Sequence, residues 1–393
     1  MSEKRHNKNI NIYNIDLTLT DDCNFNCSYC FEHGHFNHNY FKDIDLFIKR
    51  MDELLNSLFF KSNYQMLGIN FWGGEPTLHK KAIMKIIEYY KNNDKVKFFI
   101  YSNGFHIKSF MDLFITFREV ILDGNHPKLC IQISYDGMPI QDICRKTKKN
   151  ETTSCRVKNN IRMLFENKIP CVLKSTITID TFKYLPSARL DILSLMEEFP
   201  NSKDFIRSNN YFPTIDHYNI KKFTKDELKT YYNDLYKSLV SIANDEIDYY
   251  KKHKRFFLAW FNSKKSLCSA GKDIICINWD SNVFKCHGTV YEDSLSDHYI
   301  TNLNDDDFIY KIEECNKIHS INFYEEPEEC KTCIASFCLR CNSVKYENSK
   351  KKEYIDRWRD YTNQPELCEF YKLNGKICLA INEIIMGDLK NGM

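Results

Sequence analysis

The sequence lacks a strong charge of either sign. Its 55 Lys and Arg residues nearly balance its 53 Asp and Glu residues, which gives a formal net charge of +2 over 393 residues. Proteins that grip nucleic-acid phosphates are usually strongly basic, so we expect no nucleic-acid partner. Two local basic runs, "KTKK" (146–149) and "KKHKR" (251–255), are more typical of solvated surfaces than of phosphate sites.

The chain also lacks the long apolar segments that a membrane span requires. No window reaches about 18 uncharged apolar residues, so we expect no membrane-spanning helix. The N-terminal "MSEKRHNKNI" has no apolar core of a secretory signal, which favours a cytoplasmic location. In that reducing compartment, the 17 cysteines are expected to bind metal or take part in chemistry rather than form disulfides.

Apolar, β-branched runs alternate with amphipathic stretches over roughly the first 220 residues. Runs such as "IYNIDLTLT" (12–20) and "LGINFWG" (67–73) predict strands, and stretches such as "KKAIMKIIEYYK" (80–91) predict helices. About six such repeats predict an α/β fold, a partial (β/α)6 TIM-like barrel around a parallel sheet. Polar motifs follow the expected strands, at the ends where such barrels carry their active sites.

Composition divides the chain into four expected parts. Residues 1–222 should form the barrel, with its sixth strand near 204–213, and residues 223–266 a helical connector rich in lysine and tyrosine. Residues 267–375 should form a small cysteine-rich domain, whose core is too thin to fold without a metal staple. Residues 376–393 are expected to form a C-terminal tail.

Three cysteines follow the first expected strand with the spacing Cys-x3-Cys-x2-Cys. Cys23, Cys27 and Cys30 could hold three irons of a four-iron cluster and leave the fourth iron open to a small molecule. A zinc loop is the alternative, although structural zinc uses four protein ligands. The expected compartment disfavours a disulfide.

This loop and its neighbours resemble the radical S-adenosylmethionine (SAM) superfamily, whose signature has this cysteine spacing. The resemblance implies a SAM-binding 4Fe-4S cluster and reductive cleavage of SAM to a 5′-deoxyadenosyl radical that abstracts hydrogen from a substrate. It also implies a set of SAM-contacting residues on the cysteine loop and at successive strand ends. They are Tyr29, Gly73, Gly74, Glu75, Ser102, Asn103, Ser134, Asp136 and Arg145.

The resemblance gives some of these residues specific roles. Glu75 of "GGEP" would accept from the SAM ammonium, and Ser102 and Asn103 of "YSNG" would lie toward the ribose. Arg145, eleven residues after Ser134, would pair with the SAM carboxylate. The motifs "SNG" (102–104) and "YDG" (135–137, which contains Asp136) could instead be ordinary turns. Arg145 could instead be a charged residue of the surface.

A second group of cysteines fills the C-terminal region, most densely in "CKTCIASFCLRC" (330–341). Two Cys-x2-Cys pairs could close one zinc site, which would leave the other cysteines unexplained. The region instead resembles the SPASM extension of radical SAM enzymes, which carries two auxiliary 4Fe-4S clusters. The resemblance implies Cys268, Cys276, Cys286 and Cys341 for the first cluster and Cys330, Cys333, Cys338 and Cys368 for the second.

The sequence departs from the usual SPASM pattern at three places. In the dense segment, four residues separate the second and third cysteines, where the family usually has five. Two residues separate the third and fourth cysteines, where the family often has three. Ser281 stands where a glycine is usual, and Cys315 could replace Cys276. The partition of ligands between the clusters therefore stays open.

SPASM proteins mainly modify peptides and proteins, so the resemblance implies a peptide maturase. The favoured function is hydrogen abstraction from a residue of a ribosomally made precursor peptide, forming a thioether or carbon–carbon cross-link by net oxidation. Oxidation of a sulfatase Cys or Ser to formylglycine is the alternative, and that branch typically has aspartate where His287 stands. His287 could accept a proton or hydrogen-bond a cluster sulfur.

The expected partners follow from this function. They are a precursor peptide or protein and an electron donor of the flavodoxin or ferredoxin type. Because only a short segment precedes Cys23, the precursor would need a separate leader-recognition protein or would bind directly to the barrel or the SPASM surface. A non-catalytic iron–sulfur carrier or scaffold is the alternative from another class of protein. Such a carrier would not need the SAM pocket that Glu75 and Ser134 imply.

Overall fold

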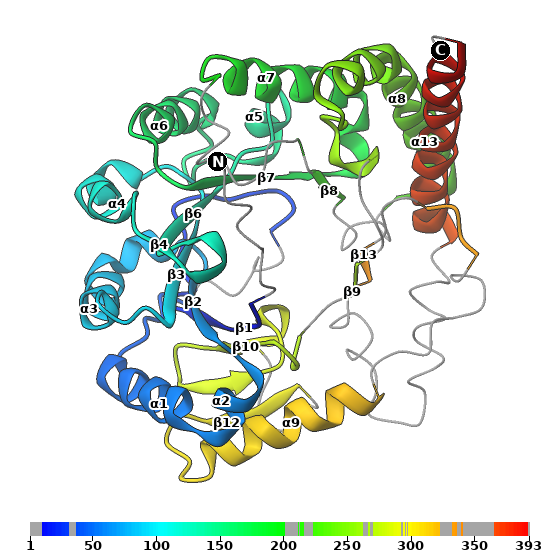
Figure 1. Ribbon diagram of the computed structural model, residues 1–393. Helices are drawn as coiled ribbons and strands as arrows, with labels where there is room; N and C mark the ends of the chain where they lie inside the picture. Colours follow the sequence, from blue (N-terminus) through cyan, green and yellow to red (C-terminus); the bar gives the residue numbers. More distant parts are fainter. Residues whose placement is uncertain are drawn as a thin grey trace, which may run out of the picture.

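The structure is a computed structural model of the chain (Figure 1). The residues that it describes are 10–30, 37–200, 211, 213–215, 223–261, 266–267, 270–291, 294, 296, 298–322, 332–335, 339–340 and 365–391. Most of the sixth strand expected at 204–213 lies outside them. Four expected cluster ligands also lie outside the described residues: Cys268, Cys330, Cys338 and Cys341.

The described strands form one large sheet and two small pairs. The large sheet contains β1 (Ile12–Thr18), β2 (Met66–Trp72), β3 (Val96–Ser102), β6 (Leu129–Ser134), β7 (Cys171–Ile177), β8 (Pro213–Ile215), β10 (Ile274–Ile277), β11 (Asn282–Phe284) and β12 (Tyr299–Asn302). The pairs are β4 (Ile121–Leu122) with β5 (His126–Pro127), and β9 (Ser266–Leu267) with β13 (Leu339–Arg340).

Helices follow most strands of the large sheet. They are α1 (Ile44–Asn56), α2 (Leu58–Asn63), α3 (Lys80–Tyr90), α4 (Met111–Phe117), α5 (Ile140–Cys144), α6 (Ser154–Glu166), α7 (Leu185–Glu197), α8 (Lys225–His253), α9 (Phe308–Asn322) and α13 (Pro365–Asn391).

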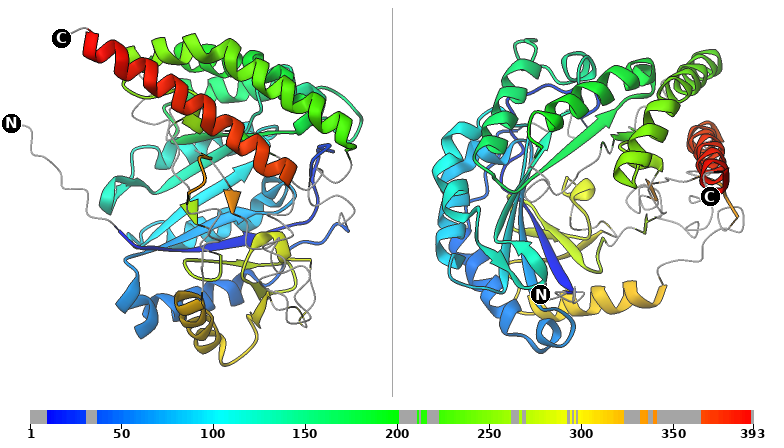
Figure 2. Two further views of the ribbon diagram at one scale, coloured as in Figure 1. Left: turned by 90° about the vertical axis from the view of Figure 1, so that its right-hand side faces the viewer. Right: turned by 45° about the horizontal axis from the view of Figure 1, so that its top comes forward.

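The large sheet is a partial barrel. Its order is β12-β11-β10-β1-β2-β3-β6-β7-β8, and every neighbouring pair from β10 to β8 is parallel. The sheet curves, and α1, α3, α4, α6 and α7 cover its outer face (Figures 1 and 2). The predicted α/β fold with a partial barrel and a C-terminal region is confirmed.

Alternation along each strand separates an apolar outer face from a polar inner one. On β1, Tyr13 and Ile15 are fully buried on the helix side, where the Tyr13 ring meets Phe59 of α2 at 5.8 Å. Asp16 points to the other side and accepts a hydrogen bond from Asn70 of β2 at 2.8 Å. Because successive strand residues face opposite ways, the apolar half drives burial and the polar half lines the barrel interior.

Soon after the expected boundary at residue 267, β10 extends the barrel sheet. β10 pairs in parallel with β1, with Cys276 opposite Asp16, and β11 and β12 continue the sheet antiparallel. The first strands of the cysteine-rich region are therefore continuous with the barrel. The division of the chain into domains stays a prediction.

The expected C-terminal tail from residue 376 is instead part of a helix. α13 runs through this boundary, and Phe370, Leu373 and Ile381 are buried on one of its faces. Phe370 contacts Phe182 and Tyr232, the latter on α8, at ring distances of 5.2 and 6.1 Å. The apolar residues at helical spacing find a partner helix, α8, and this pairing could not be read from the sequence.

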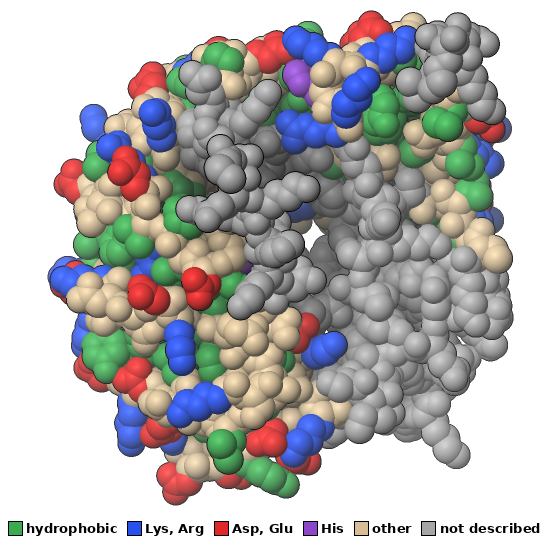
Figure 3. Space-filling view, viewed as in Figure 1, with side chains coloured by type: hydrophobic (Ala, Val, Ile, Leu, Met, Phe, Trp, Pro, Cys, Tyr) green, Lys and Arg blue, Asp and Glu red, His purple; other side chains and the backbone are tan. Residues whose placement is uncertain are grey.

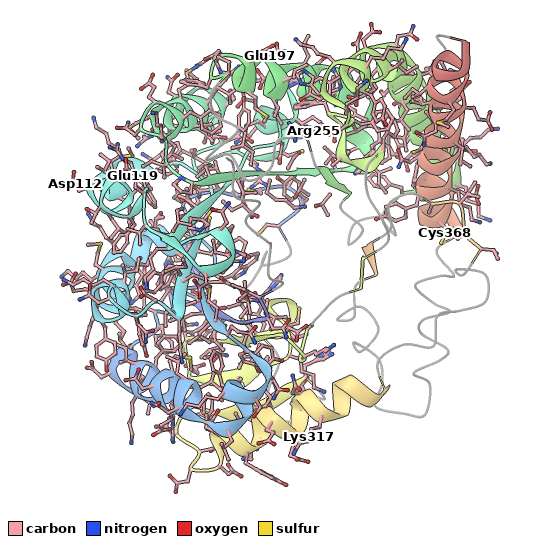
Figure 4. All side chains as sticks on the ribbon, in the orientation of Figure 1. Asp112, Glu119, Glu197, Arg255, Lys317 and Cys368 are labelled. Atoms are coloured by element: carbon pink, nitrogen blue, oxygen red, sulfur yellow. The ribbon has the colours of Figure 1, made fainter. Side chains whose placement is uncertain are left out.

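The outer surface mixes charges of both signs. Lys and Arg side chains alternate with Asp and Glu side chains over the helices seen in Figure 3. Asp112 and Glu119 lie on this outer side, whereas Cys368 lies at the lower end of α13 on the opposite side of the molecule (Figure 4). Within the described ranges, no helix combines the length and apolar character needed to cross a bilayer.

Candidate active site

A cavity of about 350 Å³ opens at the C-terminal ends of the parallel strands. It brings together residues that are far apart in the sequence and that we predicted to serve one site. Those that line it are Cys23, Cys27, Tyr29, Cys30, Gly73, Gly74, Glu75, Ser102, Asn103, Ser134, Arg145 and His287. Asp136 is fully buried behind this surface and does not line it.

The three cysteines of the loop are half-buried thiols. Burial raises the pKa of the Cys23 thiol well above its ordinary value, and the charges of Glu75, Cys27 and Cys30 raise it further. A backbone N–H, from Phe25, already points at the Cys23 sulfur at 3.4 Å. Metal ligation needs the thiolate form of cysteine, which burial disfavours. The positive charge of iron would stabilise the thiolates against this effect, so the three cysteines fit an iron–sulfur cluster.

No three His, Cys, Asp or Glu side chains of the described residues gather closely enough to hold a single metal ion. The three thiols instead share the wall of one cavity.

Two glycines let the loop after β2 pack directly on the cysteine loop. A Cβ on Gly73 would lie 2.2 Å from the Thr20 carbonyl oxygen, and one on Gly74 would lie 2.3 Å from that of Asp22. Gly73 also has a φ of +136°, which side-chain-bearing residues rarely adopt. Two hydrogen bonds join the segments, Gly74 N–H to Thr20 O and Glu75 N–H to Asp22 O, both at 2.8 Å.

Glu75 is a buried carboxylate that ties two strand ends together. One oxygen accepts from the Thr77 hydroxyl at 2.5 Å and the Ser102 hydroxyl at 2.9 Å, and the other from the Asn103 backbone N–H at 2.7 Å. Burial raises the pKa of Glu75, and these hydrogen bonds lower it in part. The second oxygen has one protein donor among these bonds, and Glu75 lines the cavity, so this oxygen has remaining capacity to accept from a ligand cation.

Asp136 supports the cavity from behind. Its Oδ2 accepts from the Tyr29 hydroxyl at 2.5 Å and Arg145 Nε at 2.8 Å, and its Oδ1 accepts from the Thr176 backbone N–H at 2.8 Å. The Arg145 guanidinium also lies 5.1 Å from the Tyr29 ring centroid. Through these bonds Asp136 orients Arg145 and Tyr29, and its expected contact with SAM stays a prediction.

Asn103 is likewise engaged within the protein. Its amide nitrogen donates to Asn24 Oδ1 at 2.8 Å and lies 3.8 Å from the Cys23 sulfur, and its amide oxygen accepts from the Phe105 N–H at 3.0 Å. These contacts place the side chain against the cysteine loop. The expected contact of Asn103 with a ribose stays a prediction.

Sequence reasoning missed Lys174, which lines the cavity from β7. Its strand partner is Ser134 of β6, so the two residues are neighbours on the cavity wall. Burial lowers the pKa of Lys174 to about 8, although the charge of Asp136 opposes this shift. A lysine at an inward position of the apolar run "PCVLKSTITI" was the available signal, because such strands rarely bury a cation without a use for it.

His287 reaches the cavity from the cysteine-rich region. Its Nδ1 lies 3.3 Å from Asp16 Oδ2, and Asp16 is only 2% exposed. Its ring lies 4.3 Å from that of Trp72, which lies 4.3 Å from Tyr101. The three rings form one wall of the cavity, and neither Asp16 nor Trp72 was predicted as part of the site.

The described auxiliary cysteines fall into two places. Cys276 is fully buried on β10, 3.5 Å from the Thr18 hydroxyl, and Cys286 immediately precedes His287. The pKa of Lys372 on α13 is raised by its hydrogen bond with Glu369 and, to a smaller extent, by the charges of Cys368 and Cys333. Both cysteines therefore lie near Lys372. Cys315 lies apart, with its sulfur 3.5 Å from the Gly271 carbonyl oxygen.

Comparison with known proteins defines the class of this one. Residues 17–193 match the radical SAM superfamily, a range that begins on β1 and ends in α7. This part of the chain is therefore a radical SAM domain, the domain of an enzyme superfamily. This family implies SAM and a 4Fe-4S cluster as cofactors, in agreement with the three-cysteine loop.

Individual relatives extend the similarity beyond this domain. The radical SAM cyclopropyl synthase TigE of Paramaledivibacter caminithermalis is 24% identical over 389 residues, covering 91% of this chain and 72% of that protein. The structure of native anSMEcpe with bound AdoMet and Cp18Cys peptide covers 95% of this chain and 99% of its own, with a TM-score of 0.61 and 17% identity. At this identity the likeness shows the fold.

A second peptide-bound structure shares the fold less completely. Streptococcus suis SuiB bound to the precursor peptide SuiA covers 82% of this chain and 69% of its own, with a TM-score of 0.52 and 12% identity. This chain is thus similar in fold to two proteins whose structures contain a bound peptide.

Proposed function

We propose that this enzyme modifies a residue of a ribosomally made peptide, forming a thioether or carbon–carbon cross-link by net oxidation. The observation that carries the proposal is the single cavity in which the three-cysteine loop meets the polar strand ends and His287 from the C-terminal region. Two fold neighbours crystallised with peptides, anSMEcpe and SuiB, support a peptide as the substrate class.

Cys23, Cys27 and Cys30 would hold the cluster that binds SAM. When bound and reduced, the cluster supplies the electron that cleaves SAM to a 5′-deoxyadenosyl radical, which removes hydrogen from the substrate. The protein supplies the surroundings of this chemistry. The hydrogen bonds from the Gly74 and Glu75 N–H groups to Thr20 and Asp22 hold the cysteine loop in place.

Charged groups of the cavity would orient SAM. Glu75 would accept from its ammonium group through the carboxylate oxygen that has the single protein donor. Arg145, held by Asp136, would face its carboxylate, and Lys174 stands beside Ser134 as a second cation for the same group. Charge-assisted hydrogen bonds of this kind are roughly twice as strong as neutral ones, so they fix position as well as affinity.

The substrate residue would enter against the aromatic wall of Trp72, Tyr101 and His287. The Nδ1 contact with Asp16 fixes the orientation of the His287 ring. His287 would accept a proton from the substrate there, at the position where the sulfatase-maturing branch typically has an aspartate. A hydrogen bond from His287 to a cluster sulfur is the competing proposal.

Two auxiliary 4Fe-4S clusters would take the second electron that net oxidation releases. Cys268, Cys276, Cys286 and Cys341 would hold the first, and Cys330, Cys333, Cys338 and Cys368 the second. The neighbourhood of Cys333 and Cys368 around Lys372 supports the second set.

Formylglycine formation in a sulfatase is the second candidate. The fold likeness to anSMEcpe over 95% of this chain favours it, and His287 in place of the usual aspartate argues against it. Membership of an enzyme superfamily leaves the non-catalytic carrier without support. A flavodoxin- or ferredoxin-type donor and a separate leader-recognition protein remain part of the proposal.

Mass spectrometry after co-expression tests this proposal. The enzyme is expressed with the small peptides that its neighbouring genes encode, and separately with a sulfatase peptide. We expect a loss of two hydrogens from a genomic-neighbour peptide and no change in the sulfatase peptide. Conversion of the sulfatase Cys or Ser alone would establish the second candidate instead.

A further inference from the structure

The lysine-rich run at 146–149 lies directly against the cysteine loop. Asn26 N–H donates to the Lys146 carbonyl at 2.8 Å, and Lys148 N–H donates to the Asn24 carbonyl at 3.2 Å. An isolated bridge joins Phe25 and Thr147 in the same antiparallel pairing. The run that composition alone assigned to solvated surface is thus the backbone partner of the loop that would carry the cluster.

The run is built as a tight turn, which we call the basic turn (residues 146–151). Thr147 N–H donates to the Glu151 carbonyl at 3.0 Å, and Asn150 N–H donates to the Thr147 carbonyl at 2.8 Å. Asn150 adopts a φ of 63°, a left-handed conformation that asparagine tolerates better than most residues. Its lysines are therefore held in fixed places relative to the cysteine loop.

The basic turn presents more positive than negative charge to solvent. Lys148 and Lys149 are exposed and Lys146 is half-buried. The acidic groups that face them are Asp22, which pairs with Lys148 at 2.7 Å and His38 at 3.1 Å, and Glu151. The Asp22 side chain is only 16% exposed, and the Glu151 carboxylate accepts from the Thr147 hydroxyl at 3.3 Å within the turn.

We propose that Lys146, Lys148 and Lys149 form the docking surface for an acidic electron-carrier protein that reduces the cluster of the cysteine loop. The inference rests on the proposed function, because that function needs a one-electron donor. The carrier's cofactor is oxidised by one electron and the enzyme is reduced by one, and no bond forms or breaks. Electron transfer falls steeply with distance, so the donor must dock beside the loop itself.

The charge of the surface selects the class of partner. Small flavin and iron–sulfur carriers with acidic faces would be steered to a positive patch, which raises the association rate roughly ten- to a thousandfold at low salt. Redox encounters of this kind use small interfaces, so one turn with three lysines is an adequate size. The basic turn combines this local charge with backbone hydrogen bonds to the cysteine loop, which places the positive surface beside the expected cluster.

The test compares two ways of reducing one holoenzyme. Lys146→Gln/Lys149→Gln removes two charges and leaves the Lys148–Asp22 pair, while Lys251→Gln/Lys252→Gln removes the same charge from the other basic run. Cluster reduction is followed by stopped-flow absorbance, with photoreduced flavodoxin and separately with dithionite. At low salt, we expect flavodoxin to reduce the cluster of the first variant roughly tenfold more slowly than that of the wild type. With dithionite, the two proteins should be reduced at the same rate. The control should match the wild type.

Salt gives a second readout. Raising the ionic strength from about 0.05 M to about 0.5 M should lower the flavodoxin-driven reduction rate of the wild type to nearly that of the Lys146/Lys149 variant. The rate of the variant itself should barely change. An unchanged flavodoxin-driven rate in the variant would overturn the docking site, as would an equal loss in the control. An equal loss with dithionite would make the turn a structural support only. A wild type that dithionite cannot reduce would refute the proposed function first.

Discussion

At the scale of single residues, one carboxylate has two tasks. Glu75 accepts hydrogen bonds from Thr77, Ser102 and Asn103, and these donors would be left unsatisfied in its absence. The same carboxylate is the acidic side chain of the "GGEP" turn that lines the cavity. Its structural and binding roles can be separated by the choice of substitution.

We predict that Glu75→Gln weakens SAM binding while keeping the fold. The amide retains an acceptor for the Thr77 and Ser102 hydroxyls and loses the charge that attracts an ammonium group. The expected loss is about 1.5–3 kcal/mol, the scale of a charge-assisted hydrogen bond. Equilibrium dialysis of reconstituted protein measures it. Glu75→Ala should in addition lower the melting temperature, and an unchanged SAM affinity in both variants would make the turn purely structural.

Lys174 should give SAM binding a pH dependence. Its pKa is lowered to about 8, so the free enzyme loses this cation as the pH rises through about 8. A bound carboxylate favours the protonated form, so affinity should be flat below this value and fall above it. Lys174→Arg keeps the charge to higher pH and should remove the fall. Identical pH profiles for the two proteins would exclude Lys174 as a carboxylate partner.

At the scale of elements, the site depends on the fit between the loop after β2 and the cysteine loop. The strands themselves were predictable, because β1, β2, β3 and β7 each alternate apolar and polar residues or form short apolar runs. The contacts of Asp136 and Asn103 could not be read from the sequence. Whether a side chain faces a ligand or another residue depends on partners that only the fold brings near.

Gly74→Ala should prevent proper cluster assembly. The added Cβ would lie 2.3 Å from the Asp22 carbonyl oxygen and force the cysteine loop away from its partner. We expect a marked loss of bound iron and labile sulfide after reconstitution, with circular dichroism unchanged. Gly387→Ala is the matched control, because its Cβ meets nothing within 4 Å. Full iron content in Gly74→Ala would show that the close approach is dispensable.

At the scale of the whole molecule, the barrel and the cysteine-rich region meet at one cavity. The continuity of β10 with β1 and the reach of His287 to Asp16 join them. Sequence motifs predicted both halves but not this junction, because it depends on β10 pairing across more than 250 residues of chain. The helix α13 was missed for a similar reason, since its apolar face is explained only by α8.

The auxiliary ligands can be tested through product rather than SAM cleavage. Cys286→Ala should leave 5′-deoxyadenosine release intact and eliminate the modified peptide, because the second electron then has no acceptor. Cys315→Ala is the control and should retain both activities, since its sulfur contacts the Gly271 carbonyl. Full product from Cys286→Ala would favour a redox-neutral reaction such as epimerisation.

The central claim is that Cys23, Cys27 and Cys30 form the SAM-cleaving centre, and one measurement tests it most directly. Anaerobically reconstituted wild type and the triple alanine variant are each given SAM and dithionite, and 5′-deoxyadenosine is quantified by liquid chromatography with mass spectrometry. The account predicts release by the wild type and none by the variant, while the variant keeps its auxiliary iron. Equal release by the two proteins would contradict it.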